Sequence, residues 1–371
     1  MSSSATIPPN TPSRSIAGAG PTQYEPGAAR HVRPSHLPGL DGIRGLAILM
    51  VLADHNFGMP GGALGVDLFF ALSGFLITRL LLADRDTPSG YYRRFYVRRA
   101  LRIAPPFYLT LAIVFATVAS LRPHWWVFTF YLANFPLLPN AFFSPVLGHT
   151  WSLATEEQFY LVWPAVVRHV RPATLIRVCV VCIALSIGGR LAVPHVVHSL
   201  EYARYWFAYA PFSRTDGLFV GASVAALADL NPEWLDRHAR RVGGMAAVAV
   251  AIVVLLRQLS FSKMSPLMAA IGLPCIAIVF GALIWTGANS GQATWIGRFF
   301  NAAWIRRVGK ISYALYLAHF PVLAFTDRFS LSSPAAWFAA HLGAAVASYA
   351  LAELSWRILE RPISSLKDRL A

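Results

Sequence analysis

The sequence predicts an all-helical fold, a polytopic transmembrane bundle of about ten helices with both termini in the cytoplasm. Two observations lead to this fold class. First, 56% of the 371 residues are hydrophobic and only 13% are charged, about half of the roughly 25% that soluble domains carry. Second, apolar residues recur in segments of about 20 residues, the length that a helix needs to cross the hydrocarbon core of a bilayer.

These segments divide the chain into a tail and a membrane domain. Residues 1–36 are rich in Ser, Pro, Gly and Ala, which predicts a disordered cytoplasmic tail rather than a signal peptide or a span. Residues 37–371 are expected to form the membrane domain. Residues 123–147 are also apolar, but four prolines interrupt them, so we expect an outer loop that Trp125 and Trp126 anchor at the interface. The predicted spans are 40–58, 64–83, 102–121, 152–168, 173–192, 205–228, 242–259, 267–287, 309–326 and 335–356.

The positive charges support this topology. The net charge is +15, and with the N-terminus inside, the predicted cytoplasmic segments contain 20 Arg and Lys residues whereas the outer loops contain 6. This bias follows the positive-inside rule and places both termini in the cytoplasm. Because the basic residues lie in short loops between apolar segments rather than on a polar domain, we expect no nucleic-acid partner.

Ionisable residues inside the predicted spans are the first candidates for chemistry, because a charge inside a membrane is costly. Arg44 lies at the inner end of the first predicted helix, and His55 follows it eleven residues later, about 16 Å deeper along the helix. Histidine can take and return a proton near neutral pH, although a lone membrane histidine is as often a packing residue. Asp67 opens the second predicted helix, where it either orients His55 or stabilises packing.

Arginines crowd the first inner loop beyond what topology requires. Six of them fall within residues 85–102. Arg99 and Arg102 share a helical face by their i, i+3 spacing. Since arginine is the preferred side chain for phosphate, this pair predicts a site for a polyanionic cytoplasmic donor. Anionic lipid headgroups are the alternative ligand.

The fourth predicted helix follows Trp151 and carries adjacent carboxylates, Glu156 and Glu157, near its outer start. Acids near a helix N-terminus can simply stabilise the helix dipole. However, Glu156 shares a face with Tyr160 by i, i+4 spacing. Glu156 is therefore a candidate for chemistry as well as for capping.

For several of the remaining polar residues in the predicted spans, we favour a structural role over a chemical one. Arg214 and Asp216 lie mid-way along the sixth predicted span, and we interpret them as a structural ion pair. Ser73 and Gly74 are small residues that permit close helix packing.

No cluster of His, Cys, Asp or Glu has metal-ligand spacing, so no metal is expected. A polar stripe on the ninth predicted span contains Ser312, Tyr313, Tyr316 and His319.

In order and spacing, these residues resemble the acyltransferase 3 family of bacterial membrane O-acyltransferases. The resemblance runs from about Leu40 to Lys367. Each block alone is weakly specific, whereas the order and spacing of the blocks together are specific. The blocks are Arg44 with His55, Gly65–Gly74, Arg99 with Arg102, Trp151–Tyr160, Arg214–Gly217, Ser312–His319 and Glu360–Pro362.

The resemblance implies a multi-pass enzyme of the bacterial inner (cytoplasmic) membrane. It implies an acyl-CoA donor, commonly acetyl-CoA, and a hydroxyl acceptor. The acceptor would be a sugar of a surface polysaccharide, a lipid-linked sugar precursor or a macrolide-like metabolite. Membrane lipids are the other expected partner.

The resulting hypothesis places the CoA phosphates on Arg99 and Arg102, with Arg44 beside them. His55 is then the general base for the acceptor hydroxyl, and Asp67 or Glu156 orients it. The alternative from another functional class is a proton-coupled transporter with a buried Asp, Glu and His relay. A transporter predicts internal repeats and needs no arginine-rich phosphate site. A purely structural scaffold is the third interpretation.

Overall fold

Helices account for every regular element of the described structure. The computed structural model describes residues 37–135, 144–196, 209–259, 265, 267–289, 294–329 and 332–370, and no strand occurs among them. The tail predicted for residues 1–36 lies outside the described residues. The described helices belong to one compact unit, Arg33–Ala371.

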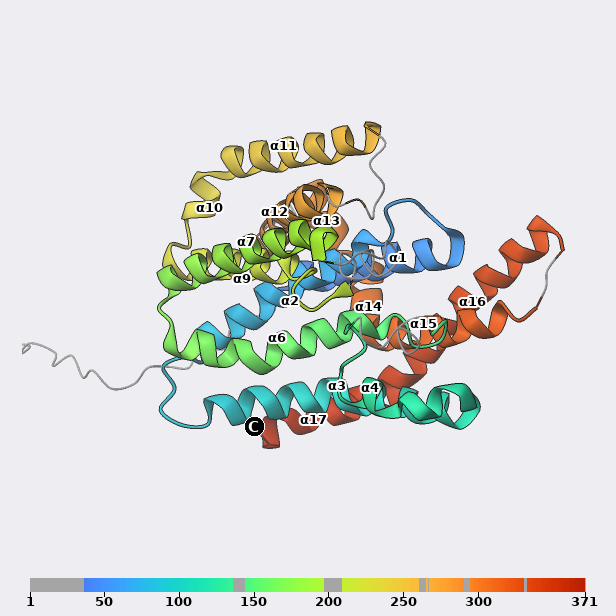
Figure 1. The fold of residues 1–371 in the computed structure, drawn as a ribbon. Coiled ribbons are helices and arrows are strands. Elements are labelled where there is room, and N and C mark those ends of the chain that lie inside the picture. The colour runs from blue at the N-terminus through green and yellow to red at the C-terminus, as the bar shows by residue number, and fades with distance from the viewer. Residues whose placement is uncertain are drawn as a thin grey trace, which may run out of the picture. The chain divides into compact units, whose positions relative to one another are not determined.

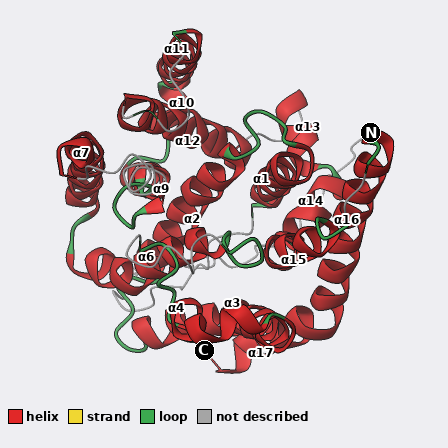
Figure 2. Ribbon diagram, turned by 45° about the vertical axis from the view of Figure 1, so that its right-hand side comes forward, coloured by secondary structure: helices red, strands yellow, loops and turns green. Residues whose placement is uncertain are grey.

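Three helices form the centre of this unit: α1 (Pro38–Phe57), α2 (Leu64–Ala83) and α9 (Asp216–Leu230). They lie between α11 on one side and α3 with α17 on the other (Figures 1 and 2). Glycines bring α2 and α9 close together. A Cβ atom added at Gly74 would lie 1.9 Å from the Leu218 carbonyl oxygen, and one at Gly221 would lie 1.9 Å from the Ala71 carbonyl oxygen. The packing role predicted for Gly74 is therefore confirmed.

The other helices surround this centre. They differ in how much of their surface is buried: α11 buries only Ala249 and Leu256 of its described side chains, as expected of a helix that faces lipid. The helical elements are α3 (Tyr91–Thr117), η1 (Ala119–His124), α4 (Trp125–Thr129), α6 (Thr150–His169), α7 (Pro172–Val196), α10 (Trp234–Arg237), α11 (Ala239–Gln258), η2 (Met268–Gly272), α12 (Leu273–Asn289), α13 (Trp295–Asn301), α14 (Ala303–Lys310), α15 (Ser312–Thr326), α16 (Pro334–Ser355), η3 (Trp356–Glu360) and α17 (Arg361–Leu370).

Several of these helices are long and apolar enough to cross a membrane, so the chain is a multi-pass membrane protein. In the described part of the chain six pass this test, and a seventh is added if α14 and α15, which meet at a bend of 68°, count as one span. The six candidate spans are Leu64–Ala83, Tyr91–Thr117, Pro172–Val193, Ala239–Gln258, Met268–Asn289 and Pro334–Ser365.

Three further predicted spans, 40–58, 152–168 and 205–228, overlap α1, α6 and α9, which are not among these candidates. The helix α9 has only 15 residues. The other two carry charged groups that lower their hydropathy, such as Asp41 in α1 and Glu156 in α6. The ten-span count thus remains a prediction.

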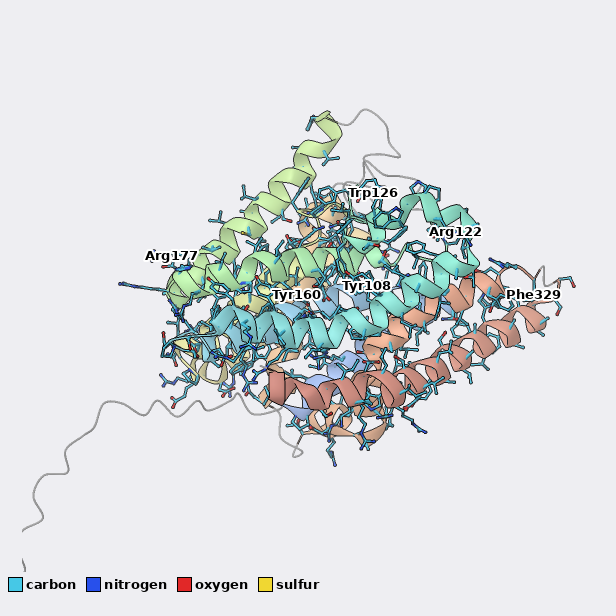
Figure 3. All side chains as sticks on the ribbon, turned by 90° about the horizontal axis from the view of Figure 1, so that it is seen from below. Tyr108, Arg122, Trp126, Tyr160, Arg177 and Phe329 are labelled. Atoms are coloured by element: carbon cyan, nitrogen blue, oxygen red, sulfur yellow. The ribbon has the colours of Figure 1, made fainter. Side chains whose placement is uncertain are left out.

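The loop predicted at the outer interface contains two short helices, η1 and α4. The side chains of Trp125 and Trp126 are exposed there, and Trp126 lies at the edge of the bundle in Figure 3. The same figure places Arg177 at one end of the helices and Arg122 and Phe329 at the other. Residues 136–143 of this loop lie outside the described part.

Candidate functional site

Three cavities follow one another along α2. Leu76, Ile77, Arg79 and Leu80 line the first, Phe69 and Phe70 line the second, and Leu64 and Asp67 line the third. Ser73 is shared by the first and second. We call the first the arginine cavity, the second the central cavity and the third the histidine cavity.

The arginine cavity has a volume of about 360 Å³ and collects five arginines with a single acid. Arg44 forms an ion pair with Asp41 at 3.1 Å. The other four have no ion-pair partner within 4 Å among the described residues. Five positive charges and one acid leave the cavity with an excess of positive charge, which favours binding of an anion with several charges. The polar lining residues are Asp41, Arg44, Ser73, Arg79, Arg98, Arg99 and Arg102.

The helix α3 supplies three of these arginines. Arg98, Arg99 and Arg102 fall within about one turn of it, so the predicted shared face of Arg99 and Arg102 is present and lines both the arginine and the central cavity. The guanidinium carbon of Arg99 lies 3.6 Å from the centre of the Tyr160 ring. This cation–π contact fixes the direction of Arg99 where α3 meets α6.

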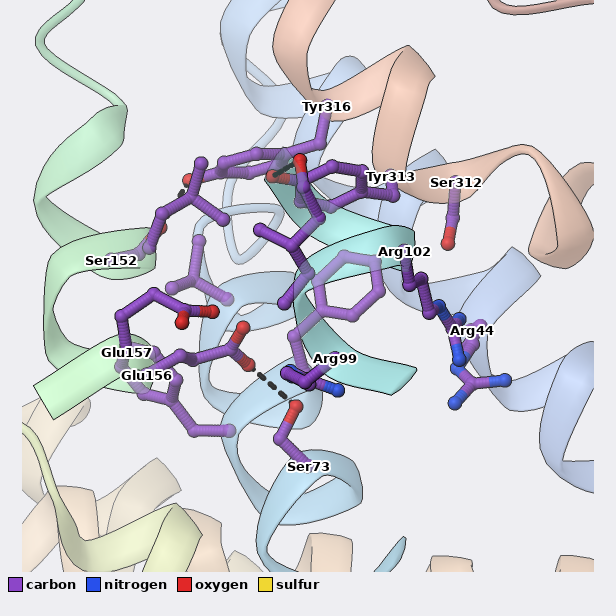
Figure 4. Close-up of a pocket in the computed structure, with 15 residues that line it drawn as sticks. Arg44, Ser73, Arg99, Arg102, Ser152, Glu156, Glu157, Ser312, Tyr313 and Tyr316 are labelled. Carbon is purple, nitrogen blue, oxygen red and sulfur yellow. Dashed lines mark hydrogen bonds between the residues drawn. The ribbon is translucent and has the colours of Figure 1, made fainter. Parts of the chain in front are cut away.

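The central cavity is smaller, about 80 Å³, and places two carboxylates beside the arginines. Ser73 donates a hydrogen bond of 2.6 Å from its hydroxyl to Oε1 of Glu156. Figure 4 shows this bond, with Arg44 and Arg102 on the opposite side of the pocket. The polar lining residues are Arg44, Ser73, Arg99, Arg102, Ser152, Glu156, Glu157, Ser312, Tyr313 and Tyr316.

Ser73 thus does more than permit close packing. Its hydroxyl is a hydrogen-bond donor to a buried acid at the junction of two cavities. The helix α2 presents Ser73 and Arg79 toward the same side as Arg44 of α1. Sequence reasoning also missed Arg79, which lies near the inner end of the second predicted span, 64–83, and lines the arginine cavity.

The histidine cavity has a volume of about 400 Å³. The Nδ1 atom of His55 lies 3.0 Å from Nε2 of His319, and the two rings are nearly parallel, at 15°, with centroids 5.2 Å apart. A third ring, that of His149, lies 5.2 Å from His319. The polar lining residues are Asp54, His55, Asp67, His149, Trp151, Tyr209, Arg214 and Tyr316.

Tyr316 lines both the histidine cavity and the central cavity. Its hydroxyl donates to the main-chain oxygen of His149 at 3.0 Å and lies 2.6 Å from the hydroxyl of Ser152. The predicted polar stripe of α15 is therefore present: Ser312, Tyr313 and Tyr316 face the central cavity, and His319 contacts His55 one turn further on.

The partners of the buried acids differ from those that the sequence predicted. Asp67 accepts two hydrogen bonds from Nη2 of Arg214, at 2.8 and 2.9 Å. Asp216 pairs instead with Arg190, at 2.5 and 2.9 Å. The predicted pair of Arg214 with Asp216 is wrong, because Arg214, just before α9, contacts Asp67 of α2, whereas Asp216, the first residue of α9, contacts Arg190 of α7.

The orientation predicted for His55 also needs correction. Asp67 is held by Arg214 and Glu156 by Ser73, whereas the hydrogen-bond partner of His55 is His319. His55 and Asp67 do line the same cavity. Within the described part of the chain, no group of three or more His, Cys, Asp or Glu side chains could hold a metal ion.

An arginine-rich cavity and a histidine-lined cavity, with a third cavity that shares lining residues with both, suit an anionic donor whose reactive group reaches into a membrane bundle. A comparison with family sequence profiles agrees with this geometry. The profile described as an acyltransferase domain of the acyltransferase 3 family matches residues 37–353. The chain belongs to this acyltransferase family. The resemblance drawn from the motifs is thereby confirmed.

The curated relatives of this chain include proteins that are named O-acetyltransferases. The chain is 28% identical over 356 residues to the peptidoglycan O-acetyltransferase OatA of Listeria monocytogenes, covering 88% of this chain and 56% of the relative. It is 30% identical over 366 residues to the putative peptidoglycan O-acetyltransferase YrhL of Bacillus subtilis, covering 88% and 55%.

The O-acetyltransferase OatA of Staphylococcus aureus is 25% identical over 361 residues, covering 89% of this chain and 57% of the relative. The chain thus spans somewhat more than half the length of these relatives. No solved structure matches it.

Proposed function

We propose that this chain is an integral membrane O-acyltransferase that transfers an acetyl group from acetyl-CoA to a glycan hydroxyl. Cell-wall peptidoglycan or its lipid-linked precursor is the acceptor that the names of the relatives favour. The observation that carries the proposal is the series of three neighbouring cavities, from the arginine cavity to the histidine cavity that contains His55.

The arginine cavity is the docking site for the phosphates of the donor. Its guanidinium groups can each donate several hydrogen bonds to phosphate oxygens. Arg44 and His55 lie on one helix, eleven residues apart, which corresponds to about 16 Å along α1. The slender pantetheine arm of CoA can cover such a distance through the central cavity, while the phosphates stay outside hydrocarbon.

His55 is the general base at the far end of the series. It takes the proton of the acceptor hydroxyl as that oxygen attacks the thioester carbonyl carbon. A C–O bond forms, the C–S bond breaks, and the departing CoA thiolate recovers the proton from His55. The products are an acetyl ester and free CoA, and the reaction needs no oxidant, reductant or metal.

The remaining site residues support this step. Glu156, held by Ser73, supplies negative charge near Arg99 on the path of the donor. Trp151 and Tyr209, whose rings pack edge to face at 5.0 Å, form an aromatic wall of the histidine cavity on which a sugar ring can rest. Asp67 and Arg214 complete that wall with polar groups.

The proposal includes a topology. The arginine cavity faces the cytoplasm, where acetyl-CoA is available, and the histidine cavity lies toward the outer face of the cytoplasmic membrane. Ten spans and two cytoplasmic termini follow from the charge bias. This arrangement keeps the donor phosphates at the membrane surface and delivers only the acyl group to the interior.

The direct test uses purified protein in nanodiscs with acetyl-CoA and a lipid-linked disaccharide precursor of peptidoglycan. We expect release of free CoA that depends on the acceptor, and a product one acetyl group heavier by mass spectrometry. A proton-coupled transporter would instead acidify the lumen of proteoliposomes without consuming acetyl-CoA. Absence of CoA release with every hydroxylated glycan acceptor would refute the proposal.

A further inference from the structure

The side chain of His319 is tied to the backbone of its own helix. Its Nδ1 atom lies 2.6 Å from the main-chain oxygen of Tyr316. A carbonyl oxygen can only accept a hydrogen bond, so Nδ1 of His319 carries a proton. In a neutral imidazole the other ring nitrogen is then an acceptor. The structure therefore assigns to neutral His319 the tautomer in which Nε2 is unprotonated and can accept a hydrogen bond.

Neutral His319 is the form that fits its surroundings. The side chain is 1% exposed, and no carboxylate lies in hydrogen-bond contact with it among the described residues. A buried charge without a partner is strongly unfavourable.

This state of His319 determines the tautomer of His55. The bond of 3.0 Å joins His55 Nδ1 to His319 Nε2. Because His319 Nε2 accepts, His55 Nδ1 must donate, and the lone pair of neutral His55 is left on Nε2. The Phe320 ring, whose centroid lies 4.7 Å from that of the His55 ring at an interplanar angle of 88°, and the hydrogen bond to His319 restrict rotation of that imidazole.

We propose that His319 is a positioning residue that holds His55 in the tautomer with a basic Nε2. This inference rests on the proposed function, in which His55 is the general base. His55 lines the histidine cavity and His319 does not, so His319 acts through His55 and not on the substrate. Two hydrogen bonds link the Tyr316 carbonyl to His319 and His319 to His55. In this arrangement the neutral imidazole of His319 takes the position that the acid has in an acid–histidine pair.

These two hydrogen bonds remain intact during the reaction. When His55 receives the acceptor proton on Nε2, its Nδ1 still donates to His319 Nε2. Returning that proton to the CoA thiolate restores the starting tautomer. No rearrangement of His319 is needed at any step, so the base is ready for the next cycle.

Transfer kinetics provide the first test. His319→Leu removes the acceptor, and we expect kcat for CoA release to fall about 10- to 100-fold, as for other lost supporting partners, with KM for acetyl-CoA nearly unchanged. His319→Gln can place an amide oxygen near the Nε2 position, and it should recover most of the loss. A matched control is His341→Gln, because His341 is also buried and bonds the backbone oxygen of Trp337 through Nδ1.

The second test measures the tautomer without any substrate. In protein labelled with ¹⁵N-histidine, with the His55 signals assigned through His55→Gln, we expect a protonated Nδ1 and a bare Nε2 at neutral pH. In His319→Leu the two nitrogens should move toward an averaged shift. A wild-type His55 protonated on Nε2, or one whose shifts do not change in His319→Leu, overturns the inference.

These two tests separate the inference from the proposed function. A fixed tautomer in a protein that transfers no acetyl group would refute the function while leaving the role of His319 in orienting His55 intact. Full transfer by a folded His319→Leu variant would refute the role of His319 alone. If His319→Leu does not fold, the wild-type tautomer still decides the inference.

Discussion

The hydroxyl of Ser73 donates a hydrogen bond of 2.6 Å to Oε1 of Glu156 and so joins α2 to α6 where the arginine and central cavities meet. The bond connects residues 83 positions apart in the chain. In the proposed function, it holds the carboxylate beside the path of the donor's arm. The charge of Glu156 is therefore expected to matter more than its shape.

Glu156→Gln tests this expectation, because glutamine preserves the shape and can still accept a bond from Ser73. We expect turnover to fall by about tenfold or more, equivalent to about 1.4 kcal/mol of transition-state stabilisation, while membrane insertion and the thermal midpoint stay near wild type. CoA release and thermal unfolding measure the two effects. If Glu156→Gln is fully active whereas Glu156→Ala is not, the residue only packs or caps α6.

The pair formed by Arg190 and Asp216 should contribute to stability and not to transfer. Arg190 is fully buried, and the pair does not line any of the three cavities. Asp216→Asn leaves a buried charge unpaired and is expected to cost about 3–5 kcal/mol of stability.

The combined change Arg190→Met with Asp216→Leu should recover much of that loss, since it removes both charges. Thermal unfolding in detergent measures stability, and CoA release per folded molecule measures function. A folded Asp216→Asn protein with normal stability but no transfer would show that the pair serves the chemistry.

Gly74 should tolerate no side chain. A Cβ atom there would lie 1.9 Å from the backbone oxygen of Leu218, so Gly74→Ala must separate α2 from α9 and should sharply reduce the yield of folded protein. The control is Gly343→Ala in α16, where nothing lies within 4 Å of the added atom. That change should be neutral or stabilising by about 0.5–1 kcal/mol. Equal yields of the two variants in size-exclusion profiles would contradict the close packing of these helices.

The sequence is sufficient to predict helices and which residues share a helix face. Apolar length predicted the candidate spans such as α2 and α12, and i, i+3 spacing predicted that Arg99 and Arg102 face one cavity. Spacing within one helix carries no information on which other helix a face meets. His55 and His319 are 264 residues apart and Asp67 and Arg214 are 147 apart, so their contacts could not be read from periodicity.

Local proximity can also mislead. Arg214 and Asp216 are near neighbours of opposite charge, and the sequence favoured their pairing. Two residues separated by two positions near a helix start project in different directions, and each charge found a partner on another helix. Ser73 was interpreted as a packing residue because small side chains often are, while its hydrogen-bond acceptor lies on a distant segment.

Removal of the two arginines that line both the arginine and central cavities should weaken donor binding. For Arg99→Ala with Arg102→Ala we expect a loss of about 1.5–3 kcal/mol for each charge-assisted hydrogen bond to phosphate. Calorimetry with acetyl-CoA measures the affinity. Arg240→Ala is the matched control, because Arg240 lies at the start of α11, is exposed and lines none of the three cavities. Unchanged affinity in the double variant would assign Arg99 and Arg102 to topology alone.

The most direct test of the account compares donor binding with acyl transfer in His55→Ala. The phosphates of acetyl-CoA would still meet the arginines, since His55 lines only the histidine cavity. We therefore expect acetyl-CoA affinity close to that of wild type, and acceptor-dependent CoA release lower by at least the roughly 10²–10⁴-fold that a general base contributes. Near-normal transfer by folded His55→Ala would contradict the central claim that this histidine is the base of the reaction.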